Sequence, residues 1–108
     1  MRVEVLHIDD CANWRDAGAL ARSVLDALGR PDVAVEFVLI ETEEQAAATG
    51  FAGSPTILVD GTDVAPAAGA GVLACRVYPT DRGSAPLPAR WQVEAAVRSS
   101  AEAGAGRS

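Results

Sequence analysis

The sequence predicts a single α/β domain in which helices cover both faces of a four-stranded mixed sheet. Short runs of branched apolar residues, typical of buried strands, alternate with segments whose apolar residues recur every three or four positions. A chain of 108 residues is long enough for one hydrophobic core. We expect the domain to span residues 1–100 and residues 101–108 to form a flexible tail, because the tail residues are small and polar.

The first strand and the first helix are predicted at the N-terminal end of the chain. Val3–Ile8 is rich in branched apolar residues, as expected of a strand that is covered on both faces. From residue 12 onward the apolar spacing becomes helical. Gly29 and Pro31 are residues that end helices, so the helix is expected to stop there.

A second strand and a short second helix follow. Val33–Ile40 is an almost continuous apolar run and predicts a strand. Thr42 and Gln45 have the spacing of a capping box. The short helix should therefore occupy residues 43–49 and end at Gly50.

The second half of the chain predicts two strands and a closing helix. Thr56–Val59 is the third strand, followed by a turn at residues 60–61. Residues 62–73 are rich in Ala, Gly and Pro and predict a loop. Val72–Tyr78 is the expected fourth strand, and residues 89–100 the last helix. The predicted element order is β-α-β-α-β-β-α.

Composition excludes several classes of function. The nine basic residues are all Arg, so the chain has no amine for a Walker P-loop or a Schiff-base enzyme. A net charge of −6 argues against a nucleic-acid partner. No apolar run is long enough for a membrane span, and the N-terminus does not resemble a signal peptide, so we expect a cytoplasmic protein without a membrane partner.

We expect no metal ion or other cofactor. The chain has one His and two Cys, so a four-ligand zinc site of the Cys₄ or Cys₂His₂ kind would need two copies of the chain. Whether the protein forms a homodimer is left open. Two cysteines without an export signal indicate a reducing compartment, in which thiols are reactive or incidental rather than structural.

Cys11 is the first candidate for chemistry, because it lies where the first predicted strand gives way to the first helix. The N-terminus of a helix favours a thiolate, whereas the adjacent carboxylates of Asp9 and Asp10 oppose one. Arg15, one helical turn further on, is the nearest cation in the sequence. A reactive thiol and a buried, inert one both remain open interpretations.

The segment Cys11-Ala12-Asn13-Trp14, taken together with Ser54-Pro55-Thr56 before the third strand, resembles the thioredoxin superfamily. The resemblance implies a βαβαββα fold. It also implies that Cys11 has the place of the family's first active-site cysteine and Pro55 that of its cis-proline, which packs against that cysteine.

The likeness extends to small bacterial thioredoxin-like proteins with a lone cysteine, some of them described as alkylmercury-lyase-like. The residues that carry this likeness are Gly53–Thr56, Val59–Gly61 and the later segment Cys75–Tyr78. It covers about residues 3–98 in topology, while its specific motifs span only a few residues.

The resemblance implies a monothiol role in thiol–disulfide chemistry. Trp14 stands where the family has its second cysteine, and Trp cannot exchange disulfides. Cys11 would form a mixed disulfide with a low-molecular-weight thiol or a protein disulfide. Cys75 is the candidate for a resolving or second thiol, although the expected topology makes a meeting with Cys11 doubtful and favours a buried strand residue.

Other residues are expected to support that site. The resemblance implies that Pro55 shapes the groove and that the backbone of Thr56 pairs with an extended substrate. Ser54 is a candidate donor to the thiolate or to a bound ligand, or alternatively a plain turn residue. Arg15 is the expected charge partner of the thiolate.

Two rival functions stay open. A non-catalytic domain of the same fold would hold a peptide, a partner or a soft metal ion between Trp14 and Pro55. Organomercurial or heavy-metal chemistry would need two thiolates and an acid, for which Cys11, Cys75 and Asp10 are the candidates.

Three side chains, His7, Trp14 and Phe51, are expected to have structural roles. His7 is expected to be a hydrogen-bonded core residue rather than a base, because four strand residues separate it from Cys11. Trp14 and Phe51 are expected to pack beneath the first helix.

Overall fold

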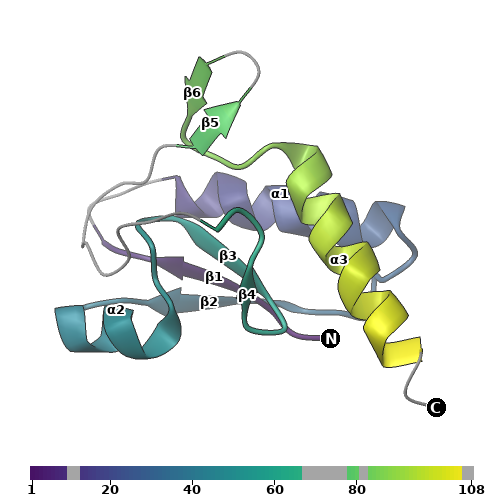
Figure 1. Cartoon of the computed structure of the whole chain (residues 1–108), viewed down its shortest axis with the longest axis horizontal. Helices are drawn as coiled ribbons and strands as arrows, with labels where there is room; N and C mark the ends of the chain where they lie inside the picture. The colour runs from purple at the N-terminus through teal and green to yellow at the C-terminus, as the bar shows by residue number, and fades with distance from the viewer. Residues whose placement is uncertain (10–12, 67–77, 81–82, 106–108) are drawn as a thin grey trace.

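The chain forms a four-stranded mixed sheet with helices on both faces, and a separate two-stranded ribbon (Figure 1). The computed structural model describes residues 1–9, 13–66, 78–80 and 83–105. The elements in chain order are β1 (Val3–His7), α1 (Trp14–Ala27), β2 (Val35–Leu39), α2 (Glu43–Thr49), β3 (Thr56–Val59), β4 (Thr62–Asp63), β5 (Tyr78–Thr80), β6 (Gly83–Ala85) and α3 (Arg90–Ala105).

The strands of the main sheet lie in the order β2-β1-β3-β4. β1 and β2 are parallel, with Val3 opposite Val35, and α1 is the crossover that parallel neighbours require. β3 runs antiparallel to β1, with Val3 opposite Val59, and β4 returns along β3. β1 is thus paired on both sides.

Two apolar clusters lie on opposite faces of the sheet, because successive strand residues point to opposite sides. On one face, α1 and α3 pack together over β1 and β3, and on the other face α2 covers the end of β1 (Figure 1). The first cluster includes Val3, Val5, Val24, Leu25, Ile57, Val59, Val93 and Val97. The second consists of Leu6, Ile8, Ile40, Ala46, Phe51 and Leu58, with Val38 packed against it.

The fourth strand of the main sheet is not the predicted one. It is β4, in a segment that was expected to be loop. Asp60 and Gly61 both have positive φ (50° and 82°), as in the tight hairpin turns that return a chain directly onto the preceding strand. Residues 72–77 of the predicted fourth strand lie outside the described residues, and Tyr78 begins the β5–β6 ribbon instead.

The last helix is longer than expected. α3 continues to Ala105, so residues 101–105 are helical rather than part of a tail. Alanine is the strongest helix former, and it recurs through this segment. The hydroxyl of Ser100 on α3 donates a hydrogen bond to the carboxylate of Asp60, which joins this helix to the β3–β4 turn.

The second helix matches its prediction at both ends. The Gln45 amide N–H donates to Thr42 Oγ1 (3.1 Å), and the Gln45 side-chain oxygen accepts from the Glu41 N–H (3.0 Å). Gly50 ends the helix in the left-handed conformation with φ 77°. Local cap chemistry therefore accounts for both boundaries of α2.

We expect Thr42→Ala to lower the free energy of unfolding by about 1 kcal/mol, because it removes the acceptor of the first-turn N–H group. Urea denaturation followed by circular dichroism measures the change. Thr42→Ser keeps the oxygen and should lie within about 0.5 kcal/mol of the parent. Equal losses in both variants would contradict the role of the cap.

Candidate functional site

The candidate site lies where the end of β1 meets the loop that precedes β3. The Ile8 amide N–H donates to Ser54 Oγ (3.2 Å) in a fully buried contact. This hydrogen bond joins the chain just after β1 to the residue that precedes Pro55. Of the predicted site residues, Asp10, Cys11 and Cys75 lie outside the described residues.

The loop before β3 is held by hydrogen bonds from within. The Ser54–Pro55 peptide bond is cis, as the resemblance implied. Thr56 Oγ1 donates to the Gly53 carbonyl (2.6 Å) and accepts from the Ala52 N–H (3.1 Å). Ser54, Pro55 and Thr56 are all buried, so these bonds are shielded from water.

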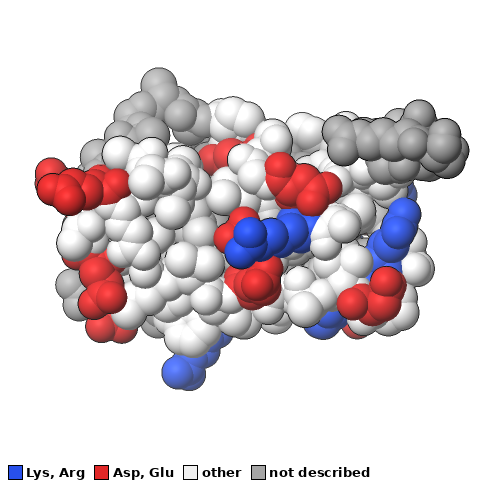
Figure 2. Space-filling model, turned by 90° about the horizontal axis from the view of Figure 1, so that it is seen from below, with Lys and Arg blue, Asp and Glu red and all other residues white. Residues whose placement is uncertain are grey.

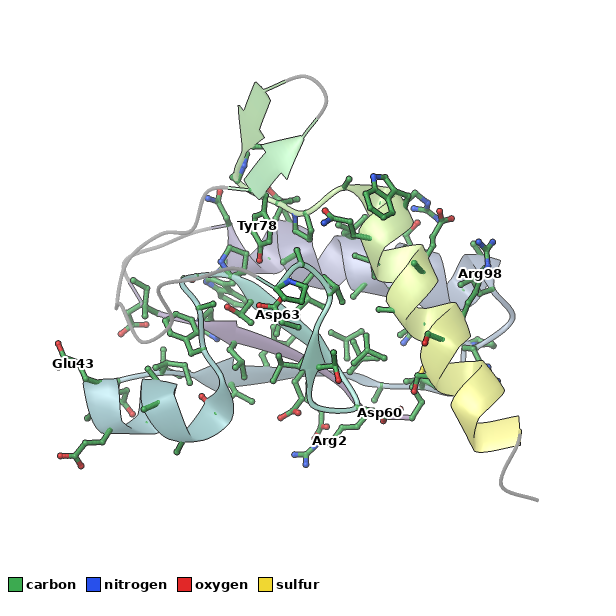
Figure 3. All side chains as sticks on the ribbon, in the orientation of Figure 1. Arg2, Glu43, Asp60, Asp63, Tyr78 and Arg98 are labelled. Carbon is green, nitrogen blue, oxygen red and sulfur yellow. The ribbon has the colours of Figure 1, made fainter. Side chains whose placement is uncertain are left out.

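Tyr78 also holds this loop in place through a hydrogen bond, a role that the sequence did not predict. Its hydroxyl donates to the Pro55 carbonyl, and its ring is 1% exposed within the cluster beneath α1 and α3. Figure 3 shows Tyr78 reaching from the β5–β6 ribbon toward the sheet. Its only sequence signal is an aromatic residue that precedes a Pro-containing loop.

An aromatic cluster formed by His7, Trp14 and Phe37 lies at the start of α1. The Trp14 ring stacks on His7 with centroids 4.6 Å apart and an interplanar angle of 18°. Phe37 meets the Trp14 ring edgewise at 5.3 Å and His7 at 6.5 Å. The guanidinium carbon of Arg15 lies 5.1 Å from the Trp14 ring centroid, within cation–π range.

The structure corrects two expectations for the aromatic side chains. His7 is buried, but its Nδ1 has no hydrogen-bond partner, so it is not the fully hydrogen-bonded core histidine that was predicted. Phe51 packs on the α2 face of the sheet rather than beneath α1. Trp14 does pack against the first apolar cluster, beneath α1 and α3, as expected.

Phe37 was overlooked, although a signal for it exists. The parallel register sets Phe37 opposite Val5. Side chains two residues apart along a strand share a face, so His7 lies on the same side as that pair. Once β1 and β2 are known to be parallel neighbours, an aromatic contact between these strands follows.

No protein-family model, curated protein or solved structure matches this chain.

Charge around the described residues is mixed rather than gathered into one basic patch. Figure 2 shows acidic side chains across one face, with basic ones interspersed. Arg2 Nε donates to Glu36 Oε2 (2.9 Å), and this hydrogen bond, with the charges of Glu36 and Glu4, raises the pKa of Arg2 above its usual value. These groups are solvated, so the pairs add little to stability.

Two properties of the described part of the chain bear on partners. None of its helices has the length and apolar character needed to cross a bilayer. Across residues 1–9, 13–66, 78–80 and 83–105, no three His, Cys, Asp or Glu side chains come together as a metal-ligand set.

We expect Tyr78→Phe to destabilise the protein by about 1–3 kcal/mol, because it leaves the buried Pro55 carbonyl without its donor. Urea unfolding followed by circular dichroism measures the loss. Ser99→Ala removes an exposed hydroxyl from α3 and serves as the control, with a change within about 0.5 kcal/mol. A Tyr78→Phe variant as stable as the control would show that the hydroxyl does not brace the loop.

Proposed function

We propose that this protein is a thioredoxin-like domain in which Cys11 carries out monothiol thiol–disulfide exchange. The arrangement of the described elements supports this. A mixed sheet of order β2-β1-β3-β4, with α1 and α3 on one face and α2 on the other, agrees with the architecture that the resemblance implies.

The observation that carries the proposal is the buried hydrogen bond between Ile8 and Ser54 (3.2 Å). Ile8 is three residues before Cys11, and Ser54 directly precedes Pro55. The two motifs are more than 40 residues apart in sequence, yet this bond joins the segments that carry them. A thiol on one segment and the proline loop on the other are the two parts that the proposed chemistry needs.

The exchange begins when the Cys11 thiolate attacks one sulfur of a substrate disulfide. A new S–S bond joins Cys11 to that sulfur as the old S–S bond breaks, and the second substrate sulfur leaves as a thiolate. A low-molecular-weight thiolate then attacks the substrate sulfur of the mixed disulfide. This step restores the Cys11 thiolate and releases a disulfide of substrate and small thiol.

The start of α1 favours the thiolate that this mechanism requires. Cys11 precedes Trp14, the first residue of α1, by three positions, and a helix N-terminus attracts negative charge. Arg15 adds a cation in the first turn, where its guanidinium lies beside the Trp14 ring. Both effects oppose the carboxylates of Asp9 and Asp10.

We expect Cys11 to react faster than Cys75 with iodoacetamide and to acquire one small-thiol adduct per chain from glutathione disulfide. Intact mass spectrometry with peptide mapping measures both. Cys11→Ser should abolish the adduct, and Cys75→Ser should keep it.

Three results would contradict this proposal. Two slowly reacting thiols would indicate a binding domain without redox chemistry. An adduct on Cys75 would show that Cys75, and not Cys11, is the nucleophile. A loss of two hydrogens with both thiols blocked would mean that Cys11 and Cys75 form a disulfide, and the route would then be dithiol.

We expect Arg15→Gln to slow alkylation of Cys11 at pH 7 about threefold, because loss of the first-turn cation disfavours the thiolate. The pH–rate profile should shift to higher pH, and the plateau rate at high pH should stay unchanged. Arg98→Gln removes an exposed Arg of α3 and is the matched control (Figure 3). An unchanged profile for Arg15→Gln would exclude Arg15 as the charge partner.

A further inference from the structure

The Nδ1 atom of His7 is an unsatisfied polar atom in a buried place. It is the one buried side-chain nitrogen or oxygen without a hydrogen-bond partner in the described part of the chain, and His7 is 9% exposed. Leaving such an atom unpaired costs about 1–3 kcal/mol, and buried polar atoms in native proteins almost always have partners. The proposed thiol chemistry gives this atom no role.

The bare nitrogen of a neutral imidazole accepts hydrogen bonds, and the other nitrogen carries the proton. Buried N–H groups without a partner are rarer than buried acceptors without one. We therefore assign Nδ1 of His7 as an acceptor. A group that satisfies it must bring an N–H or an O–H.

The ring of Phe37 fills a space that exists only because residue 18 is glycine. A Cβ atom at position 18 would lie 2.4 Å from Phe37 Cζ and 2.6 Å from Cε1. Glycine inside a helix costs about 1 kcal/mol relative to alanine, and α1 carries this cost at the point where the ring lies. The walls of this ring-shaped space are Gly18, Trp14 and His7.

The Phe37 ring borders solvent at the edge of the sheet. Its side chain is 48% exposed, although it belongs to a large apolar residue. It lies on β2, the outermost strand of the sheet on that side, so the ring can turn outward without disturbing the other strands. A phenyl ring also has no donor for the nitrogen of His7.

We propose that this space is a binding site for a flat aromatic ring that carries an N–H or O–H donor, as in an indole or a phenol. The incoming ring takes the place of the Phe37 ring over Gly18 and against Trp14, and its donor hydrogen-bonds to Nδ1 of His7. The Phe37 ring occupies the site when no ligand is bound. This inference goes beyond the proposed function, because binding needs no thiol.

The test uses the full chain carrying Cys11→Ser, so that the result does not depend on thiol chemistry. Phenylalanine labelled with ¹³C gives signals from two rings, Phe37 and Phe51, and His7 is the chain's single histidine. Titration with N-acetyltryptophanamide should shift the Phe37 and His7 signals saturably. Phe51, which is 0% exposed on the opposite face of the sheet, is the internal control.

Three variants distinguish binding at this site from non-specific hydrophobic binding. Gly18→Ala fills the space with a methyl group while raising helix propensity, so it should fold and lose binding at least tenfold. Ala19→Ser changes an exposed neighbour on α1 and should bind as the parent does. Phe37→Ala removes the competing ring and should bind more tightly.

The donor is tested with the N-methylated indole analogue, for which Kd should rise about fivefold on loss of one hydrogen bond. A short Trp-containing peptide that binds more tightly than N-acetyltryptophanamide would identify a polypeptide as the source of the ring. Equal affinities of the peptide and N-acetyltryptophanamide would identify a free aromatic compound as the ligand. The proposal is overturned if neither the Phe37 nor the His7 signal shifts in the parent and the His7 signal does not shift in Phe37→Ala. It is also overturned if Gly18→Ala binds unchanged. Equal affinity for the N-methylated analogue would overturn the hydrogen bond to His7.

Discussion

The buried loop that leads into β3 is the constraint on which the rest of this structure depends. Ser54 accepts the N–H of Ile8, Thr56 bridges Gly53 and Ala52, and Tyr78 donates to the carbonyl of Pro55. These contacts bring together segments from the N-terminal, middle and C-terminal parts of the chain. Because Ser54, Thr56 and Tyr78 are buried, losing one partner leaves a buried polar group unsatisfied, and the geometry is correspondingly well determined.

The position of this loop also bears on where the proposed chemistry would take place. β1 has paired strands on both sides, and in the sequence its C-terminal end is followed closely by Cys11. The opposite end of the sheet is closed by Asp60, which accepts hydrogen bonds from the Arg2 backbone N–H (2.7 Å) and the Ser100 hydroxyl. One end of the sheet is therefore tied by Asp60, and at the other end the buried loop meets Ile8 and the aromatic cluster lies at the start of α1.

Elements with local signals could be predicted from the sequence. α2 has a capping threonine and a terminal glycine, and β3 is a branched apolar run followed by a turn, so their boundaries match the prediction. β4 is two residues long, too short for any periodicity. The β5–β6 ribbon contains Pro79, a residue that argues against a strand, and antiparallel pairing with β6 overrides that preference.

The candidate site likewise has one part that a local sequence motif predicts and another that depends on contacts between elements. The cis bond before Pro55 was implied by a motif of a few adjacent residues, and the structure has it. The stacking of His7 on Trp14 was not predicted, because it depends on how the last residue of β1 meets the first residue of α1. The ring of Phe37 over Gly18 needs a third element, β2, and no pattern within one segment encodes such a contact.

Trp14 links the two proposals and determines how a mixed disulfide on Cys11 would be resolved. A cysteine at position 14 would supply an internal thiol for that step, whereas Trp14 supplies a ring packed between a buried histidine and the core. With no thiol at that position, the proposed monothiol route needs an external thiolate to resolve the mixed disulfide. The same ring forms a wall of the proposed aromatic site, so under both proposals the tryptophan at position 14 contributes a recognition surface and no resolving thiol. A substrate carrying an indole or phenol beside its disulfide would use both.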